Sequence, residues 1–503
     1  MSRAPRAVLA IDQGTTGSRA MLLGRDGRAL GAAYREFPQY FPAPGRVEHD
    51  PEEIWDSVVE VIRAAIAEAG LPPDAIAAVG ITNQRETTVV WDRATGRAAG
   101  PAIVWQDRRT ADRCAELRRS GEAERLRERT GLVADPYFSA TKLEWMLENH
   151  PGWRGRAESD ELRFGTVDSW LVHRLTGGRV HATDHTNASR TLLYGLDARD
   201  WDPELCAMFG VPRSMLPEIR PSAGELGRTD GDLFGAEVPV AGIAGDQQAA
   251  LYGQGGWSKG DAKNTYGTGA FLLLHTGPER GPAVPGVLTT IACGPRGEPH
   301  CAYEGSILVA GAAIQWLRDG LGLLASSEES EAVAASVDSS EGVVFVPAFA
   351  GLGTPHWIPE ARGAVFGLTR GTTGAHLVRA ALEAMAYGTL DALEAMTGPD
   401  GVRLAAFRAD GGAARNDWLM QFQADLLGCE VHRPEASELT AIGAAGLAGV
   451  GSGFWESPDE FLPALGEDRV FRPDPGSGPL REAGLAAWRR AVDALIGWSR
   501  WSG

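Results

Sequence analysis

The chain contains the same hairpin pattern twice, once in each half. In "VLAIDQGTTGSRAMLLG" (residues 8–24) an apolar run ends at Asp12, a turn rich in glycine and threonine follows, and a second apolar run leaves. "AKNTYGTGAFLLLH" (residues 262–275) again joins two extended runs through a Gly-Thr-Gly turn. Such runs joined by glycine turns predict β-hairpins. The repeat predicts that one structural unit is used twice, in a chain whose 503 residues exceed one ordinary core.

Strand and helix patterns alternate along the rest of the chain. Apolar side chains recur at helical spacing between Asp50 and Gly70, and Asp50 is a typical N-cap. Glu53, three residues after Asp50, predicts a capping box at this helix start. Further strands and helices follow in both halves, which predicts an α/β fold with sheets covered on both faces. We expect two domains, residues 1–250 and 251–503, divided between the "GDQQ" helix and the second hairpin.

The composition disfavours several classes of protein. The formal net charge of −18 argues against a general nucleic-acid binder, because phosphate backbones attract clustered positive charge. No apolar run approaches the length that crosses a bilayer, and the first turn interrupts the N-terminal stretch before a signal-peptide core could form. The five cysteines are widely spaced and form no Cys-x-x-Cys pair, so neither a zinc cluster nor a disulfide framework is indicated. We therefore expect a cytoplasmic protein without membrane insertion or a nucleic-acid partner.

Glycine-rich turns are candidates for anion binding because their backbone N–H groups form concave sites. None of the three lysines follows a glycine, which excludes a P-loop, and no Gly-x-Gly-x-x-Gly follows a strand, which disfavours a Rossmann dinucleotide site. Each hairpin turn alone is also typical of a plain loop. Facing each other across a cleft, the two turns would clamp a polyphosphate from both sides, and their occurrence in separate halves favours this interpretation.

Polar residues near these turns complete a candidate site for a nucleotide. Asp12, at a strand end, is suited to hold Mg²⁺ through water, because that ion prefers oxygen ligands and keeps much of its hydration. Arg19 would add positive charge near the transferred group. A third turn, "ADGGAARND", lies at a strand-to-helix junction. There Gly411 and Gly412 permit close approach of a flat base, and Asn416 can hydrogen-bond it, although a simple loop would look the same.

A dozen segments, in order, give the chain a specific resemblance. They are "AIDQGTTGSR", "VEHDPEEIW", "GITNQRETTVVWD", "AIVWQDRRTAD", "TGLVADPYFSATKLEW", "FGTVDSWL", "TDHTNASRT", "GIAGDQQAALYGQ", "KNTYGTGAF", "LTTIACGP", "GAAIQWLRD" and "DGGAARND". Over essentially its whole length the chain resembles the FGGY family of carbohydrate kinases, and within it the members that phosphorylate glycerol. The resemblance implies two ribonuclease-H-like domains of the actin/Hsp70/hexokinase type with a catalytic cleft between them. It also implies ATP and Mg²⁺ as cofactors, glycerol as substrate, and a homo-oligomer, either a dimer or a tetramer.

The resemblance also implies roles for particular side chains. The nucleotide contacts are Thr15, Thr16, Gly17, Arg19, Thr268, Gly311, Gln315, Gly412 and Asn416. The glycerol contacts are Arg85, Glu86, Trp105, Tyr137, Asp246, Gln247 and Phe271. Asp246 is the candidate general base, and Asp12 and Asp246 are candidates for holding the waters of Mg²⁺. Gly17 departs from the pattern, because many relatives carry serine at this position.

These residue types fit the chemistry of a small triol. Its hydroxyls need charged or amide partners, and its CH groups need apolar faces. An aspartate is a weak base toward an alcohol, but phosphoryl transfer is loose, so the proton can leave late. Two alternatives stay open. A related kinase for another polyol or sugar would share the fold, and a chaperone-like or filament-forming ATPase would share the nucleotide clamp and turn over ATP without any polyol.

Overall fold

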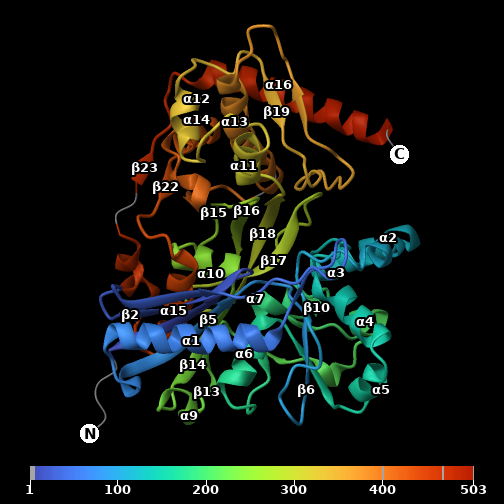
Figure 1. Ribbon diagram of the computed structural model, residues 1–503, viewed down its shortest axis with the longest axis vertical. Helices are drawn as coiled ribbons and strands as arrows, with labels where there is room; N and C mark the ends of the chain where they lie inside the picture. The colour runs from blue at the N-terminus through green and yellow to red at the C-terminus, as the bar shows by residue number, and fades with distance from the viewer. Residues whose placement is uncertain (1–5, 399–401, 467–468, 502–503) are drawn as a thin grey trace.

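Two large β-sheets organise the chain. The computed structural model describes residues 6–398, 402–466 and 469–501. One sheet is built from residues before 250 and the other from residues after 260, and a mostly helical lobe lies beside the first sheet, at the right of Figure 1. Within the described ranges, no helix combines the length and the apolar character that crossing a bilayer requires.

The first sheet has six strands in the order β13-β14-β5-β1-β2-β3. Their bounds are Ala7–Gln13 (β1), Gly17–Gly24 (β2), Ala29–Glu36 (β3), Ile76–Asn83 (β5), Ala223–Arg228 (β13) and Pro239–Gly245 (β14). β1 and β2 form the first predicted hairpin, in which Asp12 lies opposite Arg19. β1, β5 and β14 run parallel, so their carboxyl ends meet at one edge of the sheet.

The second sheet has seven strands in the order β17-β18-β16-β15-β21-β22-β23. Their bounds are Asp261–Tyr266 (β15), Ala270–Gly277 (β16), Leu288–Cys293 (β17), Pro299–Ile307 (β18), Ala406–Asp410 (β21), Val431–Arg433 (β22) and Arg469–Phe471 (β23). β15 and β16 form the second predicted hairpin, and β15, β21 and β22 run parallel. In both sheets the first strand of the hairpin pairs antiparallel with its hairpin partner on one side and parallel with another strand on its other side. This shared arrangement confirms the predicted repeat of one unit.

Helices cover both faces of the first sheet. α1 (Pro51–Ala69) and α6 (Val167–Leu175) bury one hydrophobic core against it. α10 (Asp246–Gly253) and α15 (Leu439–Gly451) bury a second core on the opposite face. Figure 1 shows α15, which comes from late in the chain, beside the strands that begin it. The C-terminal part of the chain therefore completes the core of the first sheet.

α1 begins and ends as predicted, but one detail of its start was predicted wrongly. The Asp50 carboxylate accepts a hydrogen bond from the backbone N–H of Glu52 at 2.8 Å, and Gly70 ends the helix with a φ of 60°. Glu53 does not close a capping box. Its carboxylate accepts a hydrogen bond from the hydroxyl of Tyr40 at 2.9 Å, because a β-bridge between Tyr40 and Glu48 brings that hydroxyl over the first turn.

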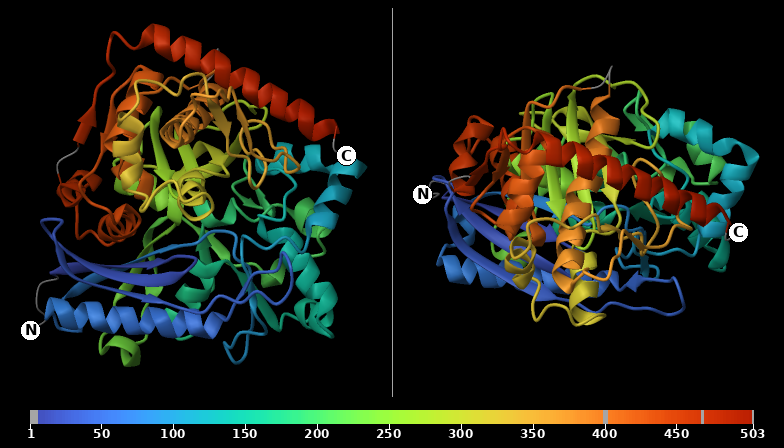
Figure 2. Two further views of the ribbon diagram at one scale, coloured as in Figure 1. Left: turned by 45° about the horizontal axis from the view of Figure 1, so that its top comes forward. Right: turned by 90° about the horizontal axis from the view of Figure 1, so that it is seen from above.

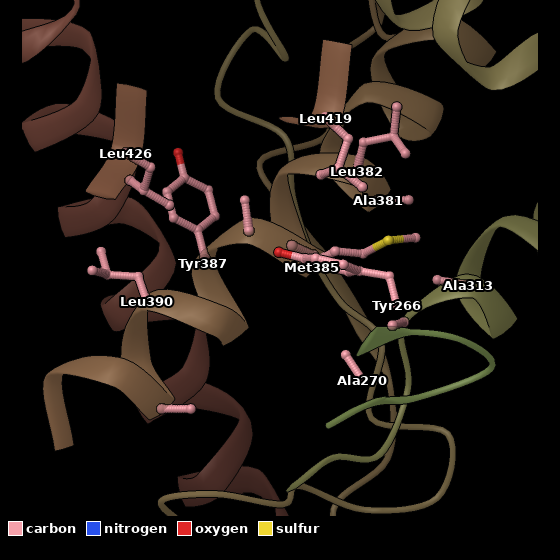
Figure 3. Close-up of a cluster of buried hydrophobic side chains, with 14 of the residues drawn as sticks. Tyr266, Ala270, Ala313, Ala381, Leu382, Met385, Tyr387, Leu390, Leu419 and Leu426 are labelled. Carbon is pink, nitrogen blue, oxygen red and sulfur yellow. The ribbon is translucent and has the colours of Figure 1, made fainter. Parts of the chain in front are cut away.

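The core of the second half packs between the second sheet and its helices. The main helices here are α11 (Gly311–Asp319), α12 (Glu329–Ala335), α13 (Gly374–Thr397) and α14 (Asp417–Leu427). Figure 3 shows Tyr266 and Met385 close together in this core. The hydroxyl of Tyr266, which ends β15, donates a hydrogen bond to the Gln423 side chain at 2.6 Å. This packing fixes the point from which the second glycine turn begins.

The remaining elements form the lobe and the outer surface. The lobe contains α2 (Ala111–Ser120), α3 (Glu122–Thr130), α4 (Ser139–Asn149), α5 (Trp153–Glu158), α7 (His185–Ala188) and α8 (Pro203–Met208). These helices surround a hydrophobic cluster that also includes residues of β17 and β18. Short paired strands are β4 (Glu48–His49), β6 (Val89–Asp92), β7 (Ala102–Ile103), β8 (Leu162–Gly165), β9 (Ala182–Asp184), β10 (Tyr194–Gly195), β11 (Asp200–Trp201), β12 (Glu218–Arg220), β19 (Val344–Val346) and β20 (Ala364–Phe366). α9 (Gly231–Phe234) is a single short turn, and α16 (Gly478–Trp501) runs across the outside of the second half (Figure 2).

Candidate active site

The parallel strands of the first sheet bring three loops to one place. Gln13, Asn83 and Gly245 end β1, β5 and β14, and Asn83 is the register partner of both others. The loops that follow them carry the first glycine turn, the Arg85 segment and the start of α10. Gln84 joins two of these loops, because its Nε2 donates hydrogen bonds to the Gln13 side chain at 3.0 Å and to the Gly14 carbonyl at 3.2 Å.

The first glycine turn closes between Gly14 and Gly17. The Gly14 N–H donates to the Gly17 carbonyl at 2.9 Å, and the Thr15 hydroxyl accepts a hydrogen bond from the indole of Trp105 at 2.9 Å. Thr16 is exposed at the tip. A Cβ at Gly17 would lie 2.5 Å from the hydroxyl of Tyr34 and 2.7 Å from a backbone oxygen. The departure from serine at this position therefore has a steric reason in this chain.

Arg19 lies one strand away from Asp12 and contacts the C-terminal part of the chain. Its guanidinium pairs with Glu438 at 2.5 Å and lies over the ring of Tyr34. Both side chains of the ion pair are about 30% exposed, so solvent reaches this cation. Arg19 is therefore placed where an incoming anion can compete with Glu438 for its charge.

The second glycine turn rests on the N-terminus of α11. The Gly267 N–H donates to the Gly269 carbonyl at 2.8 Å, and the N–H groups of Ala310 and Ala312 both donate to the Thr268 carbonyl, at 2.8 and 3.0 Å. A Cβ at Gly311 would lie 2.6 Å from the Gly267 carbonyl oxygen, so this approach requires glycine. The Thr268 and Gln315 side chains are exposed. The predicted nucleotide residues of this region therefore lie on one turn and the helix that supports it.

The third turn follows the neighbouring parallel strand. Asp410, which ends β21, is the register partner of Thr265 in β15. Gly411 has a φ of 88°, and a Cβ there would lie 2.5 Å from the Tyr266 carbonyl oxygen. Gly412 has open space where its Cβ would be. Asn416 is the N-cap of α14, and its side-chain oxygen accepts a hydrogen bond from the Leu419 N–H at 2.9 Å. Its amide nitrogen donates to the Ser330 hydroxyl at 3.3 Å.

Arg85 is the centre of the predicted glycerol residues. Its Nε lies 3.1 Å from Oδ1 of Asp246, and its Nη2 lies 3.4 Å from the hydroxyl of Tyr137. The ring of Trp105 meets that of Tyr137 edge-on, with centroids 5.5 Å apart. The Arg85 side chain is 2% exposed, whereas Asp246 keeps 34% of its side chain open. The structure thus presents the Asp246 carboxylate to solvent beside a buried arginine that fixes it.

Two residues that the sequence did not indicate, Arg190 and Glu304, hold Arg85 and Glu86. Glu304 of β18 accepts hydrogen bonds from Arg85 at 2.5 Å and from Arg190 at 2.8 Å. Arg190 also donates from Nε to the Glu86 carboxylate at 2.6 Å. Burial acts to raise the pKa of Glu304, but Arg190 and Arg85 hold that pKa below its ordinary value. Glu86, predicted as a direct glycerol contact, is 1% exposed with its carboxylate engaged by Arg190.

Asp12 has the electrostatic environment of a cation site. Burial and the nearby Asp246 carboxylate raise the pKa of Asp12 to about 7, while Arg19 acts in the opposite direction. Two carboxylates that repel each other would be relieved by a dication between them. No group of three His, Cys, Asp or Glu side chains is placed to bind a metal anywhere in the described ranges. Asp12 and Asp246 together would supply only part of the ligands of an ion, and the others would have to come from water or a bound anion.

Lys263 links Gln247, one of the predicted glycerol residues, to the second hairpin. Its ammonium donates to the side chain of Gln247 and, at 2.6 Å, to the hydroxyl of Thr265. Burial lowers the pKa of Lys263, although Asp410 and Asp246 act against that shift. Phe271 is the register partner of Thr265 across the hairpin. Lys263 could not be singled out from the sequence, because the strand pattern around a lysine does not show which residues it will contact.

Comparison with known proteins gives two family matches. The family model for the N-terminal domain of the FGGY family of carbohydrate kinases matches residues 7–253, and that for the C-terminal domain matches residues 262–452. A glycerol kinase of Brevibacillus brevis is 52% identical over 491 residues, which cover 98% of each chain. Glycerol kinase 2 of Pseudomonas aeruginosa is 54% identical over 492 residues, which cover 98% of this chain and 97% of that protein.

Solved structures share the whole fold. The crystal structure of Plasmodium falciparum glycerol kinase with ADP has a TM-score of 0.91 and 32% identity, over 99% of both chains. A xylulose kinase from Rhodospirillum rubrum has a TM-score of 0.86 and 26% identity, over 98% of this chain and 100% of that one. The two-domain architecture expected from the sequence is confirmed by these structures.

Proposed function

The chain belongs to the FGGY family of carbohydrate kinases, and we propose that within it this protein is a glycerol kinase. It transfers the γ-phosphoryl group of ATP to a terminal hydroxyl of glycerol, giving sn-glycerol 3-phosphate and ADP. The observation that carries this conclusion is the identity of 52–54% to curated glycerol kinases over 98% of the chain. The contact between Arg85 and Asp246 supports it, because it places an accessible carboxylate among groups suited to a triol.

Glycerol binds beside the Asp246 carboxylate. Charged and amide groups pair its hydroxyls, and the rings of Trp105, Tyr137 and Phe271 offer apolar faces to its CH groups. The positions of Arg85 and Glu86 depend on each other, because both belong to a buried network of ion pairs with Arg190 and Glu304. A site that pairs hydroxyls rejects analogues that lack them, because its polar groups would then be left without partners.

ATP lies between the glycine turns. The first turn, with Thr15, Thr16, Gly17 and Arg19, faces the phosphates from one sheet, and the second turn, with Thr268, Gly311 and Gln315, faces them from the other. Gly412, where a Cβ would meet nothing within 4 Å, would face the base, and the Asn416 amide, which also donates to the Ser330 hydroxyl, would hydrogen-bond it. Backbone N–H groups and threonine hydroxyls supply the donors that phosphate oxygens accept.

Asp246 orients the attacking hydroxyl and takes its proton. Because phosphoryl transfer has a loose transition state, positioning and charge neutralisation carry most of the acceleration. Arg85 fixes the carboxylate from behind at 3.1 Å and leaves its other side open. Mg²⁺, held through water by Asp12 and Asp246, would neutralise charge on the phosphates when bound. Turnover is therefore expected to stop when EDTA removes the metal.

The decisive test compares ADP release by the wild type and Asp246→Asn, with and without glycerol. We expect turnover that depends on glycerol and falls by about two to four orders of magnitude in the variant, the range for losing a general base. Asp112→Asn, an exposed acid in the first turn of α2, controls for the loss of a charge at a helix start. Near-normal turnover by Asp246→Asn would show that another group takes the proton.

A substrate panel separates the alternatives. Glycerol, xylulose, ribulose and gluconate are each offered with ATP, and a higher kcat/KM for any of the last three would replace the proposed acceptor. ATP turnover at the same rate without any polyol would instead favour a chaperone-like or filament-forming ATPase. We further propose that the protein acts in the cytoplasm as a homodimer or homotetramer, which light scattering of the purified protein tests.

A further inference from the structure

A buried polar segment lies directly behind the proposed site. Asp184 ends β9 and caps α7, and it is completely buried. Its carboxylate accepts hydrogen bonds from the backbone N–H groups of Thr186 and Asn187, from both of their side chains, and from the hydroxyl of Ser222 at 2.6 Å. This is more than a four-residue helix needs for its cap, which raises the question of what the segment supports.

The first arm of this network reaches the start of α10. The Thr186 hydroxyl donates its proton to the Asp184 carboxylate at 2.7 Å. A hydroxyl has only one proton, so its remaining capacity is to accept, and it accepts a hydrogen bond from the backbone N–H of Gly245 at 2.9 Å. Gly245 is the N-cap of α10 and immediately precedes Asp246. Thr186 therefore fixes the peptide from which the Asp246 side chain departs.

The second arm reaches the strand that carries Arg85. The Asn187 side chain donates to Asp184 and accepts a hydrogen bond from the Asn83 amide, each at 3.0 Å. Asn83 ends β5 and is the register partner of Gly245 across the parallel pair β5–β14. Thus one carboxylate, through two side chains, ties together the two strand ends that lead to Arg85 and to Asp246.

The two strand ends are also packed against each other through the arginine. A Cβ at Gly245 would lie 2.8 Å from Cδ of Arg85, so the arginine stem rests directly on the Gly245 backbone. Any shift of that peptide would therefore move the Asp246 carboxylate and the guanidinium that contacts it at 3.1 Å. Displacements of about 1 Å are enough to cost two orders of magnitude in rate.

We propose that Thr186 is a positioning residue for phosphoryl transfer, which acts through Gly245 to hold Asp246 against Arg85. The expected effect on kcat rests on the proposed function. The fixing of the Gly245 peptide rests on the hydrogen bonds alone. Thr186 itself touches no substrate, because it is completely buried behind the strand ends.

Three variants test this role. Thr186→Val keeps the shape and removes the hydroxyl, and Thr186→Ser restores it. Thr183→Val is the matched control, because the buried Thr183 hydroxyl likewise donates to a buried carboxylate, that of Asp168 at 2.6 Å, without reaching the site. The readouts are kcat and KM for glycerol and ATP, the thermal midpoint, and amide hydrogen exchange of the peptide that contains Gly245.

We expect Thr186→Val to lower kcat about 10- to 100-fold, with the KM for ATP nearly unchanged and exchange at Gly245 accelerated. Thr186→Ser should stay within about threefold of the wild type in kcat. Thr183→Val should lose thermal stability to a similar degree while keeping its kcat and its Gly245 exchange. If valine does not fold at position 186, Thr186→Cys supplies a weaker acceptor of similar size and should give a smaller change of the same kind.

Two results would overturn the proposal. One is a kcat of Thr186→Val that falls no further than that of Thr183→Val, and the other is a Thr186→Ser variant as slow as the valine one. A wild type that shows no glycerol-dependent turnover would instead overturn the proposed function. In that case exchange at Gly245 decides the positioning role by itself, since unchanged exchange in Thr186→Val would refute it without any substrate.

Discussion

Asp168 is a buried carboxyl group that the proposed site does not use. It lies in α6 and accepts hydrogen bonds from the hydroxyls of Thr166 and Thr183 at 2.5 and 2.6 Å. Burial and the nearby Asp184 carboxylate raise the pKa of Asp168 from 3.8 to about 7, although the two hydroxyls act in the opposite direction. The folded protein therefore holds a proton here that the unfolded chain releases at much lower pH.

This difference predicts a loss of stability as pH rises. The pKa is higher in the folded state, so the stabilising contribution is complete below pH 3.8 and is lost as pH rises through about 7. Asp168→Asn has no proton to lose. The free energy of unfolding is measured by urea denaturation at about pH 5 and about pH 8. Between these pH values the wild type should lose on the order of 2 kcal/mol more than Asp168→Asn loses. Equal changes in both proteins would mean that Asp168 ionises normally.

Single residues could be predicted from the sequence where a local pattern, such as the end of a strand, marks them. Asp12 and the turn glycines stand at strand ends, so the local pattern reveals them. Arg190 and Glu304 could not be predicted, because they meet only in the folded protein, 114 positions apart in sequence. A charged residue within an apolar strand shows that a partner must exist, since a buried charge needs one, but it does not show which. The assignments of individual site residues to glycerol and ATP stay predictions.

Among the elements, hairpins and the long first helix were predictable because their signals are local. The role of α15 was not, because nothing in its pattern shows that it packs on a sheet whose strands all lie between residues 7 and 245. Its contact with α10 is unusually close for two helices. A Cβ at Gly443 would lie 1.9 Å from the carbonyl oxygen of Ala249, a backbone atom that cannot rotate away. The division near residue 250 stays a prediction.

The close contact makes Gly443→Ala a test of how α10 is held. In an exposed helix this substitution stabilises by up to about 1 kcal/mol. At position 443 the added methyl forces the helices apart, so we expect a loss of about 1–3 kcal/mol in unfolding free energy and a lower kcat, because α10 begins at Asp246. Gly497→Ala in α16, where a Cβ meets nothing within 4 Å, is the matched control and should not destabilise. Similar denaturation curves for both variants would contradict the steric argument.

At the scale of the whole molecule, one buried carboxylate joins the two halves at the site. Glu304 comes from β18 of the second sheet, and both of its partners, Arg85 and Arg190, come from the first half. All three side chains are nearly inaccessible to water. The orientation of Arg85, and through it that of Asp246, therefore depends on how the halves meet. The relative placement of the two domains therefore acts directly on the predicted glycerol residues.

Glu304→Gln tests that effect. The amide leaves two buried guanidinium groups without their shared carboxylate, so we expect a loss of about 3–5 kcal/mol in unfolding free energy. Arg85 would also lose its anchor, and the KM for glycerol should rise about tenfold or more while the KM for ATP changes less. Because the variant is expected to be less stable, activity is assayed well below its thermal midpoint, so that only folded protein is compared.

Glu383→Gln provides the control, because Glu383 pairs with Arg379 at 3.0 Å entirely within the second half. Both variants remove a carboxylate from a largely buried ion pair, so both should unfold more easily. Only Glu304→Gln should change glycerol binding if the halves control Arg85 through this contact. If the KM for glycerol responds equally in the two variants, the change reflects general loosening of the second half, and the carboxylate that bridges the halves serves folding rather than the site.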